Sequence, residues 1–303
     1  MLSDANQAFA AAPGPSSISY VGRHWGLRGI LDVRLVSEMM PTRHVAHDYN
    51  PDHPKLDLRS VHVLGGLPFG GEVIDFIAGH DTPQIGQQLA SIRAYSRLAQ
   101  SDGFEGDANV PYVEARHTIA VDGHPRVTSE RMLVAWVEHR LTQSTAAHVF
   151  PTDDLVYSNR FRLLETDRPF RPALRTPTPR VAGVVHATTD APPAGATDQI
   201  AQLDQQGRYT VHFLFDKADV TKRPRSSARV RMMQPHAGPS YGMHFPLKPN
   251  VEVLVAFIEG DPDRPVIAGS VPHPLTTSPV TRENAQMNNI RTESGIRIEM
   301  KDA

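Results

Sequence analysis

The sequence predicts a mainly-β fold with one main helix, and three observations support this. The chain has 303 residues and 26 prolines, and proline loses a hydrogen bond inside a helix or a central strand. Apolar residues alternate with polar ones through much of the chain, which is the period of a β-strand. Only one segment, starting at Thr82, combines helical spacing with helix-start signals. We therefore expect many short strands and a single long helix.

The helix is predicted to begin at Thr82 as N-cap, with Pro83 in the first helical position. Proline is tolerated there because its missing N–H would have had no partner. Gly103 offers a stop. The apolar residues that recur near helical spacing are Ile85, Leu89, Ile92 and Leu98. We expect this apolar face to pack on a sheet.

Strands are predicted where apolar and polar residues alternate. The predicted segments are residues 131–141, 209–215, 228–234, 251–258 and 265–270. After residue 181 the chain is predicted to be almost entirely β, with Gly, Pro and Asp turns such as residues 259–265. Residues 289–300 alternate again after a polar loop, and we expect a strand pair that ends before finding its partner.

Two of these strands indicate a closed barrel. Tyr209, Val211, Phe213 and Phe215 share one face, and residues 251–257 repeat the arrangement with Val251, Val253, Val255 and Phe257. Five or so such strands in under about 100 residues fit the oligonucleotide/oligosaccharide-binding (OB) barrel. We expect the aromatic residues of the first strand to lie in its core.

Composition excludes several classes of protein. The 31 Lys and Arg residues against 33 Asp and Glu give a net charge of −2, which argues against a free-standing nucleic-acid coat protein. The absence of cysteine removes disulfides, thiolate zinc sites and iron–sulfur clusters. Apolar residues never gather into the run of about 18 that a membrane span needs. The start, Met1 to Asp4, lacks the features of a secretory signal.

A Pro-rich connector at residues 169–180 predicts the main domain boundary, since four prolines fall within its twelve residues. Residues 9–17 carry little that could be buried and read as part of a loose lead-in. The predicted organisation is a lead-in at 1–25, a first domain at 26–168, the connector at 169–180, the barrel at 181–275 and a further segment at 276–303.

Gly238 to Gly242 matches the G-x-S-x-G pattern of a serine hydrolase, with Ser240 as the nucleophile. That motif requires a strand-to-helix turn, whereas residues 243–249 contain two prolines and no helical pattern. We interpret Ser240 as part of a barrel loop. No catalytic residue, cofactor site or metal site is predicted, and the chain is expected not to be an enzyme.

Three further clusters also have structural explanations. His44, His47 and Asp48 lie in a strand-and-turn region without a helical HExxH motif, so a surface or partly buried polar pair is expected instead of a zinc site. Asp261 and Asp263 lack the other oxygen ligands of a calcium loop, and a β-turn is expected. Residues 65–71 lack the Lys-Ser/Thr of a phosphate loop and are expected to form a flexible hairpin or inter-strand loop.

A basic cluster on the predicted barrel keeps single-stranded nucleic-acid binding open as an alternative. Its members are Lys222, Arg223, Arg225, Arg229 and Arg231. Against this alternative, the aromatic residues of the neighbouring strand share the face of Val211, as core residues would.

Four blocks of this chain, in order, resemble the spike-base OB domain of valine-glycine repeat (VgrG) proteins: residues 206–216, 228–239, 242–246 and 251–270. Upstream, residues 48–51, 92–94 with 104–106, 159–161 and 169–172 resemble the later part of the tail-hub domain of the same family. The resemblance extends over roughly residues 26–300.

The resemblance implies a fold and partners. The fold would be mainly β, with a partial tail-hub-like domain, an OB barrel and the start of a trimeric β-helical stalk. The function would be that of a homotrimeric spike of the type VI secretion machine, docking on the Hcp tube and baseplate components and supporting a needle. A PAAR tip protein or effectors would bind only if a full needle is present. A phage or prophage baseplate hub is the alternative.

Two departures from the family pattern bear on this expectation. The front of the hub domain is missing or replaced by the lead-in, and the needle repeats are cut off after Met300. The chain is expected to be either a fragment or a shortened relative. The resemblance also implies assembly in the cytoplasm and export by the machine without a signal peptide.

Overall fold

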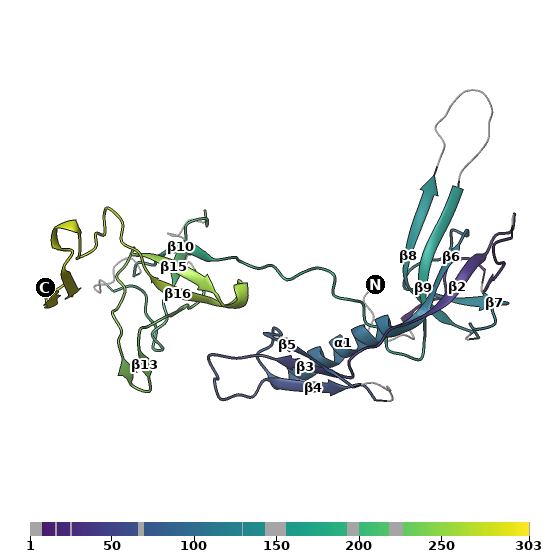
Figure 1. The fold of residues 1–303 in the computed structure, drawn as a ribbon, viewed down its shortest axis with the longest axis horizontal. Helices are drawn as coiled ribbons and strands as arrows, with labels where there is room; N and C mark the ends of the chain where they lie inside the picture. Colours follow the sequence, from purple (N-terminus) through teal and green to yellow (C-terminus); the bar gives the residue numbers. More distant parts are fainter. Residues whose placement is uncertain are drawn as a thin grey trace, which may run out of the picture. The chain divides into compact units, whose positions relative to one another are not determined.

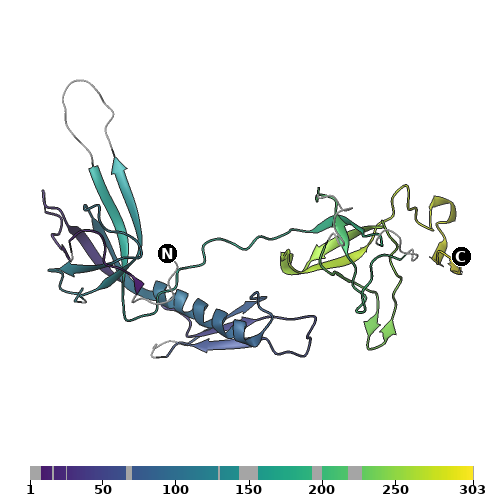
Figure 2. The same cartoon turned by 180° about the vertical axis from the view of Figure 1, so that it is seen from behind.

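A computed structural model describes the chain over residues 8–15, 17–24, 26–65, 70–128, 130–142, 156–192, 200–217 and 227–302. The chain forms two compact units, Met1–Thr176 and Pro177–Ala303. The division falls within the Pro-rich segment 169–180. The described residues are mainly β-strands with one α-helix, as predicted (Figures 1 and 2). Among these residues, no helix is both long enough and apolar enough to cross a membrane.

The first unit contains a six-stranded sheet in the order β1-β7-β8-β9-β6-β2. Its strands are β1 (Ser17–Ser19), β2 (Ile30–Ser37), β6 (Asp102–Ala108), β7 (Thr118–Asp122), β8 (Met132–Thr142) and β9 (Val156–Glu165). The β8 strand matches the predicted strand at 131–141 to within one residue at each end. The far ends of β8 and β9 extend beyond the rest of the sheet (Figures 1 and 2). The core of this sheet includes Ile30, Met132, Phe161 and Leu163, all fully buried.

The segment expected to be a loose lead-in is instead partly packed. Phe9 and Ile18 are 8% and 3% exposed, β1 pairs in parallel with β7, and Ala11 bridges Thr118. The physical reason is that β7 has a free edge, and a short strand with one buried apolar residue is enough to pair with it. The sequence did not indicate this strand, because the residues around Ile18 are small.

A smaller, three-stranded sheet has the order β4-β3-β5. Its strands are β3 (Arg43–His47), β4 (Arg59–Val63) and β5 (Glu72–Phe76). The β3 strand pairs antiparallel with β4 and parallel with β5. The helix α1 (Pro83–Ser101) covers one face of this sheet. Its N-cap is Thr82, whose hydroxyl accepts a hydrogen bond from the N–H of Ile85, which confirms the predicted start.

The face of α1 that packs on the sheet differs in part from the predicted one. Gly86, Ala90 and Ala94 are buried against the sheet, whereas Ile85 and Ile92 are exposed. Small residues prevail because the helix approaches the sheet closely: a Cβ on Gly86 would lie 2.7 Å from Oγ of Ser60. Of the residues predicted to face the sheet, Leu89 does pack against this core, so apolar spacing alone identified only part of the buried face.

The second unit contains a five-stranded sheet in the order β11-β10-β15-β16-β12. Its strands are β10 (Val184–Thr189), β11 (Val211–Phe213), β12 (Arg231–Met232), β15 (Glu252–Phe257) and β16 (Pro265–Ser270). Tyr209 bridges Val230, with N–H to O distances of 2.8 and 2.7 Å. This pair joins the β11 side to the β12 side and closes the sheet into a barrel, as predicted. The buried core includes Tyr209, Val211, Val253 and Val255.

Two hairpins and two 3-10 helices complete the second unit. The hairpins are β13 (Ala237–Gly238) with β14 (Tyr241–Gly242), and β17 (Met287–Arg291) with β18 (Arg297–Lys301); the 3-10 helices are η3 (Ile258–Gly260) and η4 (Arg282–Asn284). The second hairpin confirms the strand pair predicted at 289–300.

Candidate functional site

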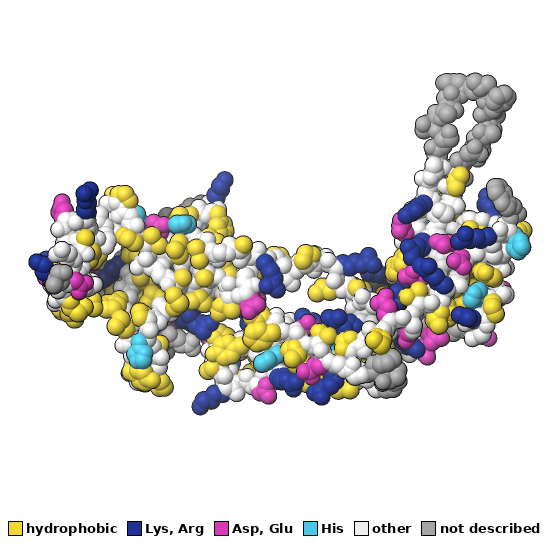
Figure 3. All heavy atoms as spheres, viewed as in Figure 1, with side chains coloured by type: hydrophobic (Ala, Val, Ile, Leu, Met, Phe, Trp, Pro, Cys, Tyr) yellow, Lys and Arg dark blue, Asp and Glu magenta, His cyan; other side chains and the backbone are white. Residues whose placement is uncertain are grey.

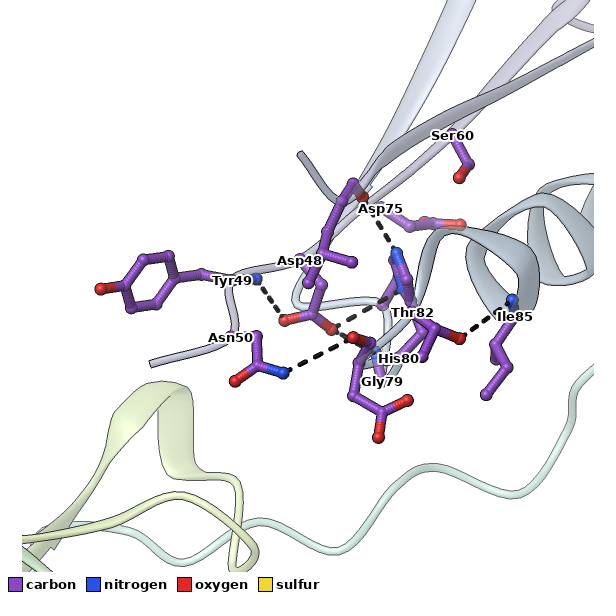
Figure 4. Close-up of polar contacts among 12 residues, drawn as sticks. Asp48, Tyr49, Asn50, Ser60, Asp75, Gly79, His80, Thr82 and Ile85 are labelled. Carbon is purple, nitrogen blue, oxygen red and sulfur yellow. Dashed lines mark hydrogen bonds and ion pairs between the residues drawn. The ribbon is translucent and has the colours of Figure 1, made fainter. Parts of the chain in front are cut away.

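A buried carboxylate joins the segment after β3 to the loop before α1 (Figure 4). Oδ1 of Asp48 accepts a hydrogen bond from the N–H of Tyr49 at 2.7 Å. Its Oδ2 accepts from the N–H groups of Gly79 and His80 at 2.7 and 3.0 Å. A charged acceptor with three backbone donors is among the stronger arrangements in a protein interior. Asp48 thus holds two segments together that are about 30 residues apart.

His80 extends this network beneath the helix. Its Nε2 lies 2.9 Å from the carbonyl oxygen of Leu58, and its Nδ1 lies 3.8 Å from Oδ2 of Asp48. Neither of the two side chains has exposed surface, so neither can reach a substrate. The pair positions the beginning of α1 and is not a catalytic dyad.

An ion-pair cluster lies on the six-stranded sheet, centred on Glu105 of β6. Its carboxylate is 3.2 Å from Arg34 of β2, 2.8 Å from Arg160 and 3.6 Å from Arg162 of β9. Burial alone would raise the pKa of Glu105, but hydrogen bonds from Arg160 and Arg34 and the charges of Arg160 and Arg162 outweigh it and lower the pKa. A carboxylate kept ionised by three cations is unsuited to general acid chemistry.

An apolar cleft of about 400 Å³ lies where β2, the end of α1 and β6 meet. Leu35, Leu98 and Phe104 line it, and Asp102 with Arg168 stands at its rim, 3.1 Å apart. A hydrogen bond from Ser37, followed by Arg168, lowers the pKa of Asp102 against the effect of burial. This cleft offers room for an apolar side chain, and the Ser37 hydroxyl beside it donates to Asp102, whose lowered pKa makes it a weak base for activating a nucleophile.

Ser240 lies in the turn of the β13–β14 hairpin. Its φ is 61°, and irregular chain, not a helix, follows at residues 243–251. A nucleophile elbow needs a strand, a sharp turn and then a helix. The structure therefore confirms that Ser240 belongs to a loop of the barrel unit.

His44 and His47 lie three positions apart on β3, so their side chains point to opposite faces of the sheet. His44 is buried on the α1 side, and His47 contacts the ring of Phe76. Within the described ranges, no group of three potential ligands is close enough to hold a metal ion. This histidine pair cannot bind one ion jointly.

The Asp261 segment forms the predicted β-turn, because the N–H of Arg264 donates to the carbonyl of Asp261 at 3.0 Å. Of the glycine-rich loop 65–71, residues 66–69 lie outside the described residues. The same holds for Lys222, Arg223 and Arg225 of the basic cluster. Of its remaining members, Arg229 donates to the carbonyl of Gln202 at 2.9 Å and Arg231 is on β12.

The aromatic residues of the barrel divide between core and surface. Tyr209 is fully buried, and its hydroxyl lies 3.1 Å from Nε2 of His244. Phe215, which we expected in the core, is 69% exposed. The alternation stops there because β11 ends at Phe213 and the chain turns, with the N–H of Asp216 donating to the carbonyl of Phe213. Phe213 stacks on Phe215 and Phe257, with ring centroids 5.3 and 6.3 Å apart.

The β17–β18 hairpin has one apolar face. Ile290 pairs with Ile298 and Asn288 with Met300 in the antiparallel register, so Ile290, Ile298 and Met300 share a side. All three are exposed. A two-stranded hairpin is at best marginally stable alone in water, so this apolar face is suited to contact with further chains.

Exposed apolar side chains are also frequent elsewhere in both units, and Figure 3 shows them over much of the visible face of the barrel unit. On the barrel unit they include Met233, Tyr241, Met243 and Phe245. Monomeric proteins rarely expose such patches without a binding role. Sequence patterns did not single these residues out, because an exposed and a buried apolar residue look alike in a short loop.

Two family models match this chain. Residues 1–145 match the phage tail baseplate hub (GPD) model. Residues 200–271 match the type VI secretion system/phage-baseplate injector OB domain. The first match includes the helix α1 and the strands β1 to β8. The second match includes the strands β11 to β16 of the barrel unit.

Curated relatives are spike proteins. The chain is 28% identical over 306 residues to the type VI secretion system spike protein VgrG1a of Pseudomonas aeruginosa, covering 97% of this chain and 46% of that protein. It is 30% identical over 248 residues to VgrG4b of the same organism, covering 77% of this chain and 30% of that protein. The chain therefore spans less than half the length of these relatives.

A solved structure shows the same fold. The Francisella PdpA-VgrG complex in its lidded form aligns with a TM-score of 0.52 at 7% identity, covering 99% of this chain and 47% of that chain. The hub match, the OB match that follows it and the spike relatives over most of the chain all agree. The chain belongs to the VgrG-type spike family, with a phage-tail baseplate hub domain followed by an injector OB domain.

Proposed function

We propose that this chain forms the trimeric hub and neck of a type VI secretion spike, docking on the Hcp tube and supporting the puncturing needle. One observation carries the proposal: a hub domain and an injector OB domain follow each other in one chain, and a hairpin with a bare apolar face follows the barrel. These parts are in the order a hub, a neck and a needle would require.

The hairpin supports the trimer in particular. Each strand of the hairpin forms backbone hydrogen bonds to the other strand along one edge only. The side chains of Ile290, Ile298 and Met300 remain exposed. Three copies wound around one axis would bury these apolar faces against one another and pair the outer edges. The hairpin would then be the first layer of a stalk, starting within the segment 276–303.

The role would be mechanical and not catalytic. Asp48 and Glu105, two carboxylates with several polar partners each, fix backbone segments or neighbouring strands. Ser240 lacks the strand–turn–helix setting of a nucleophile. The chain would work by shape, rigidity and docking, and the machine would export it as part of the spike.

Size-exclusion chromatography with light scattering tests the assembly. We expect a trimer for the purified chain, a smaller trimer fraction for Ile298→Asp, and no change for Glu299→Ala on the opposite face of the same strand. A monomer at micromolar concentration would count against the proposal. Co-purification with Hcp, compared with a phage tube protein, tests the docking step.

The Hcp comparison also addresses the alternative of a phage or prophage baseplate hub, which the name of the hub family favours. Preference for the phage tube protein would move the chain into that class. A strain with a disabled secretion machine should retain the chain inside the cell if it is a secretion spike.

Single-stranded nucleic-acid binding remains a second candidate because Phe213 and Phe215 form a stack that reaches the barrel surface. Stacking on exposed aromatic rings is how such barrels hold bases. Binding of a single-stranded DNA oligomer that weakens with salt and is lost in Phe215→Ala would establish this candidate. Unchanged fluorescence polarisation at low salt would eliminate it.

A further inference from the structure

One face of the three-stranded sheet carries exposed apolar side chains. The α1 helix covers the face of His44, Ala46 and Ser60, so the alternate residues point away from the helix. Among them Val63, Ile74 and Phe76 are 58%, 56% and 57% exposed. We call these three side chains the sheet face. Val45, at the centre of this surface, is 1% exposed beneath its neighbours.

The α1 helix has a second bare apolar surface, on the side away from the sheet. Because Gly86, Ala90 and Ala94 face the sheet, a turn of 3.6 residues places Ile85 and Ile92 toward the opposite side, whereas Leu89 packs against the core that Ala46, Ala78 and Ala90 form. Ile85 and Ile92 are 42% and 45% exposed, and Leu89 is half-buried. We call Ile85 and Ile92 the helix stripe.

The two surfaces cannot cover each other within one chain, because they are on opposite sides of the same two-layer element. We propose that the helix stripe of one copy packs on the sheet face of the next copy, head to tail. A sheet with one apolar face typically buries it under a helix, and here each copy offers both parts. This inference rests on the proposed trimer, because a head-to-tail contact that closes after three copies forms a ring.

Size and charge favour a second copy as the occupant. The sheet face has three exposed apolar side chains and the helix stripe has two, and a contact would bury on the order of 400 Å² of apolar area, the apolar part of a small interface that three copies would repeat around the ring. On the sheet face, Glu72 is paired with Arg43 and Arg59 at 3.2 and 3.7 Å, which leaves one positive charge in excess. The exposed Asp81, just before the helix stripe, has the opposite sign.

Cysteine cross-linking tests the contact directly, because the chain has no cysteine of its own. Two differently tagged variants, Ile74→Cys and Ile92→Cys, are co-expressed and oxidised. We expect a disulfide-linked pair with both tags, and little cross-linking when either variant is expressed alone. The control replaces Ile92→Cys with Gln87→Cys, whose side chain donates to the carbonyl of Val61 on the sheet side of α1, and should give no product.

Light scattering on the same samples separates this inference from the proposed function. A trimer that gives no more cross-link with Ile92→Cys than with Gln87→Cys overturns the head-to-tail contact and leaves the spike proposal intact. A monomer overturns both.

Circular dichroism would show whether each cysteine variant folds. If one does not, a pair of oppositely charged substitutions tests the same contact. Ile74→Lys and Ile92→Glu should each reduce the trimer fraction several-fold, and the double variant should recover it. Recovery occurs only if position 74 of one copy faces position 92 of the next, so its absence would contradict the contact.

Discussion

A Cβ atom on Gly86 would lie 2.5 Å from Nε2 of His80. Both residues are buried, and the imidazole is held by the carbonyl of Leu58 at 2.9 Å. The helix can therefore lie this close to the sheet only because Gly86 has no side chain.

Gly86→Ala should destabilise the first unit. Alanine favours helix by up to about 1 kcal/mol over glycine, but overpacking against an immobile ring costs about 1–3 kcal/mol. We expect a net loss of about 1–2 kcal/mol in the free energy of unfolding, measured by urea denaturation. Gln88→Ala, on the exposed side of α1, is the control and should be neutral or slightly stabilising. Equal stability of Gly86→Ala and wild type would show that His80 can move aside.

Asp48→Asn should cost about 2–3 kcal/mol, because a charged acceptor of three backbone N–H groups is replaced by a neutral one that can face only some of them. Thermal unfolding would measure the loss. Asp81→Asn, an exposed neighbour of the same network, should change the midpoint little. A similar drop for both variants would mean that general charge, not the buried contacts, is responsible.

Stability should fall on mild acidification because of His44. Burial, followed by the charge of Arg97, lowers the pKa of His44 below its ordinary value of 6.5. The unfolded chain thus binds the proton more readily than the folded one, and stability is lost as the pH falls from about 6.5 towards the lower folded-state pKa. Asp75 opposes the shift and His62 adds to it.

His44→Phe should remove part of this pH dependence. Between about pH 7.5 and 5.5, the melting temperature of the wild type should fall by more than that of the variant. Parallel curves for the two proteins would assign the acid sensitivity to other groups.

Glu105→Gln should leave Arg34, Arg160 and Arg162 without their shared counter-charge. We expect a loss of about 1–2 kcal/mol, reduced from the cost of a fully buried pair because the arginines are partly exposed. The loss should shrink in about 0.5 M salt. Glu138→Gln, which breaks the exposed pair with Arg140, is the control and should cost less than about 0.5 kcal/mol.

Local signals predicted the start of α1, the β8 strand, the Asp261 turn and the β16 strand. For the helix start and the turn, the deciding interaction is near in sequence: the Thr82 hydroxyl accepts a hydrogen bond from the N–H of Ile85, and the carbonyl of Asp261 accepts one from the N–H of Arg264. The two strands were predicted from their alternation alone, although β8 pairs with β9, which is more distant in sequence. The resemblance of four blocks predicted the family, which no periodicity could have done.

Long-range packing decided what local patterns could not. The buried side of α1 depends on Ser60 and His80, which lie outside the helix, and the role of Asp48 depends on Gly79. Phe9 is buried because β7 has an edge to pair, and Phe215 is exposed because β11 ends early. Only the spacing of Gly86, Ala90 and Ala94, a row of small residues, could have indicated the correct face in advance.

The pairing of β10 with β15 has a consequence for synthesis on the ribosome. His186 of β10 and Glu252 of β15, joined at 2.7 Å, are 66 residues apart in the chain. At about 5–20 residues per second, β10 emerges several seconds before its partner strand exists. During that interval its edge is open to other nascent chains on the same messenger, so the rate of translation through residues 190–250 sets how long the barrel is vulnerable to mispairing.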